Sequence, residues 1–157
     1  MPKKRKKITS HTISNRRASH HYTLSDNLIV GIKLIGAEVK SLRLGHGDLK
    51  GAYVTLKNNE LWLINATIHG TKGIIITDSD KTRARKILAR RQEINKLIEA
   101  KQTGKTIIPI EILTKEKFIK LKIALGKGKK NYDKRQLLKR RDQMKSINIE
   151  LKRKIQN

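Results

Sequence analysis

The sequence predicts a mainly β fold: a small antiparallel β-barrel with flanking α-helices and a basic C-terminal tail. Three observations predict it. Several short segments alternate apolar and polar residues, as strands with one buried face do. Asn58-Asn59 separates two of these segments and suits a tight hairpin turn. Positive charge is concentrated at the two ends of the chain, outside the patterned middle.

The predicted strands occupy most of the patterned middle. Residues 28–35 and 118–125 alternate apolar and polar side chains, and residues 106–113 form a third apolar segment in which Pro109 suits an edge strand. Residues 52–57 and 60–66 form the hairpin. Trp62 and Phe118 lie within these strands, and we expect both in the core. Several short strands joined by hairpin turns favour an OB-like barrel.

Two segments predict helices. Residues 37–44 follow Gly36 and make a short helix that Gly45 ends. Apolar residues at helical spacing between Asp80 and Ala100 predict a longer helix with basic residues around its other faces. Residues 69–79 stay unplaced, because Ile74 to Ile76 fits a strand whereas the surrounding glycines fit a mobile connection.

Charge divides the chain into three parts. The 157 residues include 38 Lys and Arg against 13 Asp and Glu, a net charge of +25. Residues 1–22 carry +7, residues 23–125 carry +9 and residues 126–157 carry +9. We therefore expect a disordered basic arm over residues 1–14, a folded body over 15–125 and a basic tail over 126–157. Such an excess implies a polyanionic partner, either nucleic acid or an anionic membrane.

A membrane is the weaker of these two partners. No apolar run reaches the roughly 18 residues that a membrane-spanning helix needs, and the N-terminus lacks the apolar stretch of a signal peptide. A peripheral basic helix on a lipid surface would leave the patterned middle unexplained. We therefore expect RNA as the partner and no membrane.

The tail is expected to fold only on its partner. Gly126 to Lys130 predicts a flexible cationic segment, and Asp133 with Gln136 has the spacing of a capping box. Beyond it, Met144, Ile147, Leu151 and Ile155 make a thin apolar stripe on an otherwise basic segment. This stripe is too thin to hold a helix against the body. We predict a tail that is disordered when free.

No set of residues predicts covalent chemistry. The chain has no Cys, and its five His residues show no metal-ligand spacing. Asp78 and Asp80 form the only close carboxylate pair that an RNA-processing enzyme would need. We therefore expect no catalytic residue, no metal and no cofactor. The absence of Cys fits a reducing cytoplasm.

Residues 36–43, Gly-Ala-Glu-Val-Lys-Ser-Leu-Arg, leave two interpretations open. In the first, they form a short solvated helix in which Glu38 balances nearby basic residues. In the second, Glu38 orients basic side chains while Lys40, Ser41 and Arg43 donate hydrogen bonds to RNA phosphate and ribose. Outside this segment, Tyr132 lies among cations in the tail, which suits base stacking.

These segments resemble the small protein B family of bacteria, the SsrA-binding proteins, from about Asn15 to Lys145. The resemblance rests on residues 15–18 with His20 and Tyr22, on GxEVKSLR at 36–43, and on KGKKxYDKR at 127–135. It is also carried by Gly45 with Leu49, Lys50, Tyr53 and Val54, by residues 60–65, and by residues 83–88 with Glu93, Ile94 and Leu97. The two longer motifs, in this order and spacing, are highly specific.

The resemblance implies a function, partners and site residues. Family members bind the tRNA-like domain of transfer-messenger RNA and bring it, with alanine and elongation factor Tu, to ribosomes stalled on broken messages. The expected partners are therefore transfer-messenger RNA and the small-subunit rRNA of the ribosome, with elongation factor Tu and alanyl-tRNA synthetase reached through the RNA. By the same carry-over, the RNA-binding residues of the body are Asn15, Arg16, Arg17, His20, Tyr22, Glu38, Lys40, Ser41 and Arg43. The residues that read the decoding centre are Lys127, Lys129, Lys130, Tyr132, Asp133, Lys134 and Arg135.

Three positions depart from the family pattern. Thr67 replaces a usual His, Gly126 replaces the usual Ala before KGKK, and Gln143 aligns near an aromatic residue of some relatives. These departures affect one strand end, the root of the tail and one tail contact. The alternative function is that of a structural ribosomal protein, which shares such basic tails.

Overall fold

A computed structural model describes residues 12–114, 117–130, 139–140, 142–145, 147 and 149. Seven strands form one antiparallel sheet in the order β1-β8-β9-β2-β7-β5-β4. Their bounds are β1 Ile13–Ser14, β2 Tyr22–Ile32, β4 Tyr53–Lys57, β5 Glu60–Ile64, β7 Arg85–Leu88, β8 Thr106–Leu113 and β9 Lys120–Gly128. A second sheet pairs β3 Gly47–Asp48 with β6 Thr67–Ile68. The helices are α1 Ala18–His21, α2 Gly36–Arg43, α3 Asp78–Lys81 and α4 Arg91–Gln102.

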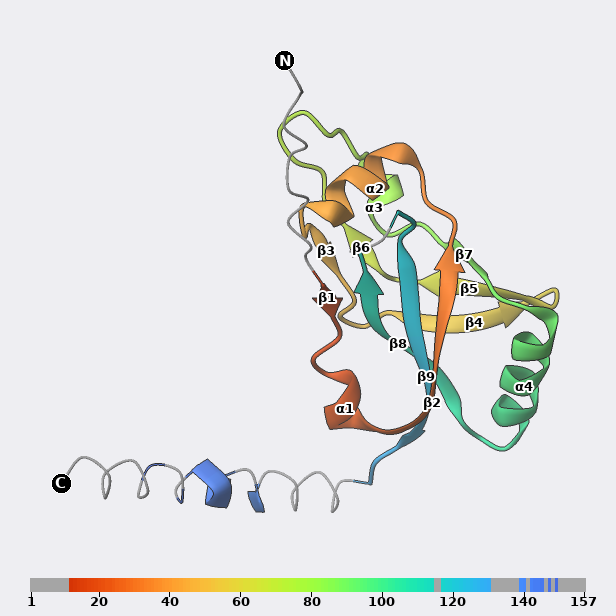
Figure 1. Ribbon diagram of the computed structural model, residues 1–157, viewed down its shortest axis with the longest axis vertical. Helices are drawn as coiled ribbons and strands as arrows, with labels where there is room; N and C mark the ends of the chain where they lie inside the picture. The colour runs from red at the N-terminus through yellow and green to blue at the C-terminus, as the bar shows by residue number, and fades with distance from the viewer. Residues whose placement is uncertain are drawn as a thin grey trace.

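The main sheet curls without closing. In Figure 1 the β4–β5 hairpin crosses β8 and β9, and β4 contacts β8. Among the described residues no ladder joins these two strands, so the barrel stays open. α2 and α3 lie together at one end of the sheet, and α1 lies at the opposite end, beside the end of β9. The predicted mainly β, antiparallel class is confirmed, and the barrel is OB-like only in its overall form.

The predicted alternation in the two longest strands is confirmed. Ile119, at the entry to β9, and Leu121, Ile123 and Leu125 within it are buried, while Lys120 and Lys122 are half-buried. In β2, Val30 and Ile32 are buried on the same core. This strand begins earlier than predicted, at Tyr22, and a bulge between Ser25 and Leu28 separates its two halves. Such bulges bend a strand, which helps the sheet to curl.

The predicted hairpin is also confirmed. β4 and β5 pair from Tyr53 with Ile64 to Lys57 with Glu60. Asn58 and Asn59 adopt positive φ angles of 51° and 61°. Both angles are required by the tight turn, and Asn tolerates this left-handed conformation better than most residues.

The predicted helix over residues 80–100 is wrong in its first half. Residues 85–88 form β7, which pairs with β5 and β2, and α4 begins only at Arg91. Arg85 and Ile87 of β7 are buried whereas Leu88 is exposed, so the segment has the two-residue period of a strand. The helical pattern failed because a charged residue, Arg85, occupies a core position. α4 starts where Glu93 accepts a hydrogen bond from the Arg90 N–H, 2.7 Å away.

Three predictions of position are also corrected. Phe118 precedes β9 and is 69% exposed, so it is not a core residue. Trp62 of β5 is only half-buried. Pro109 lies in β8, which is not an edge strand, because β1 pairs with residues 111 and 112 on its outer side. Pro109 is nevertheless accommodated at an irregularity, since the register with β9 shifts between Pro109 and Glu111.

The ends of the folded body differ from those predicted. Ile13 and Ser14, placed in the disordered arm by the sequence, form β1, and Ile13 is buried. Gly126 to Gly128, predicted to be flexible, continue β9 and pair with Tyr22 to Leu24. The unplaced residues 69–79 contain a turn closed by Thr71 and Ile74, followed by a buried Ile76.

The tail is described only in part. Residues 139–140, 142–145, 147 and 149 are helical, and Met144 and Ile147 are exposed. The predicted capping pair, Asp133 and Gln136, lies outside the described residues. Within the described part of the chain, no helix is long and apolar enough to cross a membrane.

Candidate RNA-binding surface

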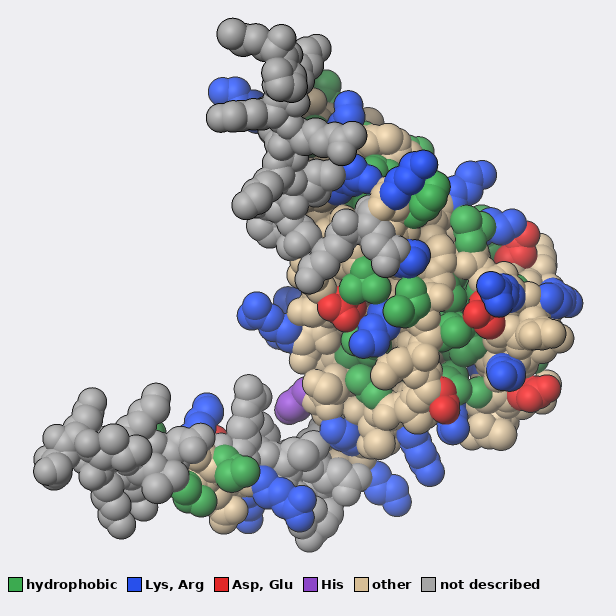
Figure 2. Space-filling view, viewed as in Figure 1, with side chains coloured by type: hydrophobic (Ala, Val, Ile, Leu, Met, Phe, Trp, Pro, Cys, Tyr) green, Lys and Arg blue, Asp and Glu red, His purple; other side chains and the backbone are tan. Residues whose placement is uncertain are grey.

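The body presents basic side chains over its surface. Figure 2 shows Lys and Arg side chains around the periphery of the visible face, with Asp and Glu scattered among them. Apolar side chains are also exposed on this face, between the charged ones. A basic surface on a rigid body is the electrostatic requirement for binding a folded RNA.

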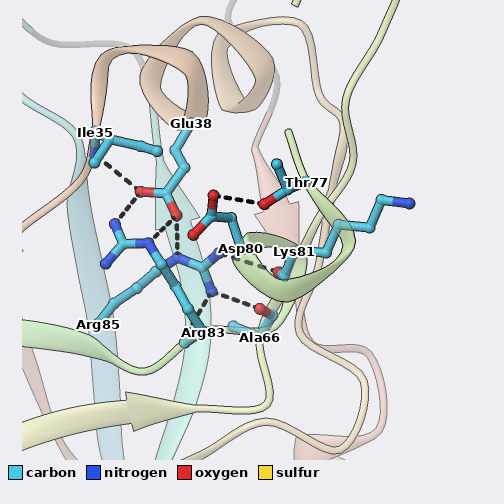
Figure 3. Close-up of polar contacts among 8 residues, drawn as sticks. All are labelled: Ile35, Glu38, Ala66, Thr77, Asp80, Lys81, Arg83 and Arg85. Carbon is cyan, nitrogen blue, oxygen red and sulfur yellow. Dashed lines mark hydrogen bonds and ion pairs between the residues drawn. The ribbon is translucent and has the colours of Figure 1, made fainter. Parts of the chain in front are cut away.

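An ion-pair cluster lies beneath α2, as Figure 3 shows. Glu38 is fully buried and accepts hydrogen bonds from two guanidinium groups. The Arg83 Nε and Nη2 atoms lie 2.9 and 2.5 Å from its two carboxylate oxygens. The Arg85 Nε atom lies 2.8 Å from Oε1. The same carboxylate accepts the Ile35 N–H at 2.9 Å and so caps the first turn of α2.

Arg85 extends this cluster into the neighbouring loops. Its guanidinium is fully buried and donates to the carbonyl oxygens of Ala66, Asp80, Lys81 and Arg83, at 2.6 to 3.1 Å. Burial lowers the pKa of Arg85, and the charge of Glu38 opposes that effect. The cluster therefore ties α2 to the turn between β5 and β6, to α3 and to β7.

These contacts show how residues 36–43 are held in the fold. Glu38 does orient arginines, but its partners are Arg83 and Arg85 from distant segments. Ser41, predicted to donate to RNA, is fully buried and its hydroxyl donates to the His69 carbonyl oxygen. In this structure the two side chains hold the fold, and a role of either residue in RNA binding stays a prediction.

The exposed face of α2 keeps its basic residues. Lys40 is exposed. Arg43 is half-buried, and its Nη2 atom donates to the Lys117 carbonyl oxygen at 3.0 Å. Lys40 therefore stays a candidate for direct RNA contact, and Arg43 couples the end of α2 to the segment before β9.

A second group of predicted residues surrounds α1. Asn15 is anchored to β8 by its Nδ2 atom, 3.0 Å from the Pro109 carbonyl oxygen. Arg16 and Arg17 are exposed, whereas His20 and Tyr22 are half-buried. The His20 ring meets the adjacent His21 ring edge-on, with centroids 5.0 Å apart. The structure brings Asn15 and Tyr22 together with Lys50 and Tyr53, to which the sequence assigned no site role, around one hollow of about 640 Å³.

The tail residues divide at the end of β9. Lys127 is exposed within β9. Lys129 contacts the body through its backbone N–H, 3.0 Å from the His21 carbonyl oxygen, and through its Nζ atom, 2.6 Å from the Ser19 carbonyl oxygen. Lys130 is exposed. The remaining predicted residues, Tyr132, Asp133, Lys134 and Arg135, lie outside the described part of the chain.

The carboxylate pair considered for an enzyme is engaged elsewhere. Asp78 bonds to Lys81 at 2.5 Å, and this contact holds the pKa of Asp78 below its ordinary value. Asp80 accepts the Thr77 hydroxyl at 2.7 Å. Each carboxylate thus serves the turn around α3.

Sequence comparisons match most of the chain. A family model described as SmpB protein matches residues 12–153. An SsrA-binding protein of Streptococcus agalactiae is 41% identical over 139 residues, which cover 88% of this chain and 90% of that protein. An SsrA-binding protein of Enterococcus faecalis is 39% identical over 153 residues, 97% of both chains.

Structural comparison agrees with the sequence matches. A solved chain from work described as "tmRNA-SmpB: a journey to the center of the bacterial ribosome" superimposes with a TM-score of 0.63. It is 34% identical, and the match covers 76% of this chain and 85% of that one. The body, its ion-pair cluster and the basic strand that leads into the tail all lie within the matched family region. This chain belongs to the SmpB family of SsrA-binding proteins.

Proposed function

We propose that this protein binds the tRNA-like domain of transfer-messenger RNA and delivers it to stalled ribosomes for trans-translation. The observation that carries the proposal is the family match over residues 12–153, which includes both the body and the basic tail. Its relatives bear the name SsrA-binding protein, and its structural neighbour comes from work on the bacterial ribosome. A net charge of +25 supplies the attraction for RNA.

The body and the tail have separate tasks. The folded body, residues 15–125 with the strands that extend it, binds the RNA through Arg16, Arg17 and Lys40. Glu38 and Ser41 act indirectly, because they hold α2 and the loops beside it in place. The tail enters the vacant mRNA channel and reads the decoding centre with residues 127–135.

The proposal also covers the indirect partners, the cellular location and the chemical role of the protein. Elongation factor Tu and alanyl-tRNA synthetase are reached through the RNA, and the protein acts in the bacterial cytoplasm. It contributes binding and positioning, and no covalent chemistry. Its tail, which is helical at its described residues 139–140, 142–145, 147 and 149, is helical on the ribosome, where the RNA offsets its charge.

Deletion of residues 131–157 tests the division of tasks. We expect the shortened protein to bind the tRNA-like domain within about twofold of the full chain, because the body is unchanged, and to lose peptide tagging. A control with the same tail residues in scrambled order keeps the charge and should also fail to tag. Loss of RNA binding on truncation would contradict the division.

A gel-shift comparison tests the RNA partner. The protein should bind transfer-messenger RNA more tightly than bulk tRNA at the same salt concentration. It should also copurify with a stalled minority of ribosomes. Equal amounts on all ribosomes would instead support a structural ribosomal protein.

A further inference from the structure

A hollow beside α1 combines an apolar floor with aromatic and cationic walls. It lies between α1, the turn that precedes β4 and the first residues of β8, and its volume is about 640 Å³. Ala18, Ala52 and Ile108 are buried and belong to its lining. The volume is within the range of about 300 to 1,000 Å³ that is typical of small-molecule sites.

Two tyrosines and two cations also line the hollow. Tyr22 begins β2 and Tyr53 begins β4. Tyr53 is 48% exposed, whereas the next residue, Val54, is buried in the core. Tyr53 therefore faces away from the core. Arg17 and Lys50 are exposed. A planar apolar ligand carrying negative charge fits this combination of side chains.

The turn that carries Lys50 and Tyr53 is held by several contacts. Gly51 has a φ of +74°. Its carbonyl oxygen accepts a hydrogen bond from the Asn65 Nδ2 atom, 3.2 Å away. The Asp48 carboxylate accepts the Lys50 N–H at 2.8 Å. The hollow is therefore preformed, which lowers the entropic cost of binding.

A smaller hollow of about 260 Å³ adjoins the first. The two share Asn15, Arg17 and Lys50, and the second also includes Arg16 and Asp48. Cations therefore occupy the boundary between two neighbouring concavities. Consecutive phosphates of a single strand flank each base in the same way, whereas a duplex hides its base faces.

We propose that this pair of hollows binds an unpaired RNA nucleotide, with its base stacked on Tyr53 and its phosphates on Lys50 and Arg17. The inference rests on the proposed function, because the RNA-binding activity brings the strand to this surface. It adds Lys50 and Tyr53 to the binding residues, and it assigns them different chemistry. Stacking depends little on salt, whereas a phosphate contact releases counterions.

Three variants test this assignment through affinity for the tRNA-like domain over a series of salt concentrations. Tyr53→Ala should weaken binding about five- to a hundred-fold and leave the slope of log affinity against log salt unchanged. Tyr53→Phe keeps the ring and should stay within about twofold. Lys50→Gln should reduce the steepness of the slope by about one. The matched control is Phe118→Ala, which removes an aromatic ring that is 69% exposed and does not line the hollow.

Abasic nucleotides identify the base. Each unpaired position of the tRNA-like domain is replaced in turn, and one replacement should weaken wild-type binding without weakening Tyr53→Ala binding further. The same measurement with small ribosomal subunits distinguishes rRNA as the source of the nucleotide. Coupling in either RNA supports the site. If Tyr53→Ala is folded by thermal unfolding and binds both RNAs as tightly as wild type, the inference is overturned and the proposed function stands. If the wild-type protein fails to bind transfer-messenger RNA, the proposed function itself is overturned.

Discussion

At the residue scale, Glu38 joins the start of α2 to Arg83 and Arg85, which are distant from it in the sequence. Its carboxylate is fully buried and is bonded to Ile35, Arg83 and Arg85. Burying a charge is costly unless close partners satisfy it. The bidentate contact with Arg83 and the carbonyl partners of Arg85 meet that condition. An SsrA-binding protein therefore keeps a carboxylate inside a strongly basic body for a structural reason.

Removing this charge should destabilise the protein. Glu38→Gln leaves the buried Arg85 guanidinium without its counter-charge, and we expect a loss of about 3 to 5 kcal/mol in the free energy of unfolding. Urea denaturation measures this loss. The control is Glu111→Gln, whose partner Lys122 lies 3.9 Å away at a partly exposed site and which should cost less than about 1 kcal/mol. Equal losses in the two variants would contradict the structural role of Glu38.

Sequence reasoning found Glu38 but not its partners. The spacing within residues 36–43 indicated that a carboxylate orients basic groups, and neighbouring Lys40 and Arg43 were the visible candidates. Arg83 and Arg85 are 45 and 47 residues away along the chain. Such a pairing depends on how β7 packs against α2, and no local pattern specifies it. The same reason explains why Ser41 was predicted at the RNA surface, when its hydroxyl bonds to His69.

At the element scale, β9 joins the folded body to the tail. Its last residues, Gly126 to Gly128, pair with the start of β2, and Lys129 is bonded to Ser19 and His21 of α1. The tail therefore leaves the body from an anchored strand. Its first residues have a fixed direction relative to the hollow beside α1.

The close packing around Gly126 predicts an energetic coupling with Ile108. A Cβ atom at Gly126 would overlap Ile108 Cδ1 and lie 3.1 Å from Tyr22 Cβ. We expect Gly126→Ala to cost about 1 to 3 kcal/mol of stability and Ile108→Val about 0.5 to 1.5 kcal/mol. The double variant should lose about 1 kcal/mol less than the sum, because Val lacks the overlapping methyl.

Thermal or urea unfolding of all four proteins measures this coupling. Strictly additive losses would show that Ile108 reorients without cost and would contradict the overlap. Gly126→Ala should leave the salt dependence of RNA binding unchanged in protein that remains folded, since no charge is altered.

The elements themselves were predictable to different degrees. The β4–β5 hairpin, α2 and the alternating part of β9 have local signals: the Asn58-Asn59 turn, flanking glycines and a two-residue period. β7 has no such signal, because its buried Arg85 interrupts the apolar pattern, so the segment was merged with α4. The two-residue strands β1, β3 and β6 are too short to show any period.

At the scale of the whole molecule, the net charge of +25 attracts the protein to RNA. The logarithm of the affinity for transfer-messenger RNA should fall linearly with the logarithm of the salt concentration. Each phosphate contact should contribute about 0.7 to 0.9 to the magnitude of that slope. Filter binding between low and physiological salt measures the slope. An affinity that does not change with salt would contradict electrostatic docking. Deleting residues 131–157 should leave most of the slope for the tRNA-like domain, because the contacts that set it belong to the body.

The sequence by itself determined the class of fold, the uneven distribution of charge along the chain, and the family. These properties depend on composition, on the period of apolar residues and on ordered motifs, all of which are local or additive along the chain. Tertiary structure alone decided that Glu38 and Ser41 face inward, that residues 85–88 form a strand and that Lys50 and Tyr53 meet Asn15 and Tyr22 around one hollow. Each of these depends on contacts between distant segments. The free energy of burying a side chain depends on the groups that contact it. Folding of the sheet brings those groups together from distant parts of the sequence.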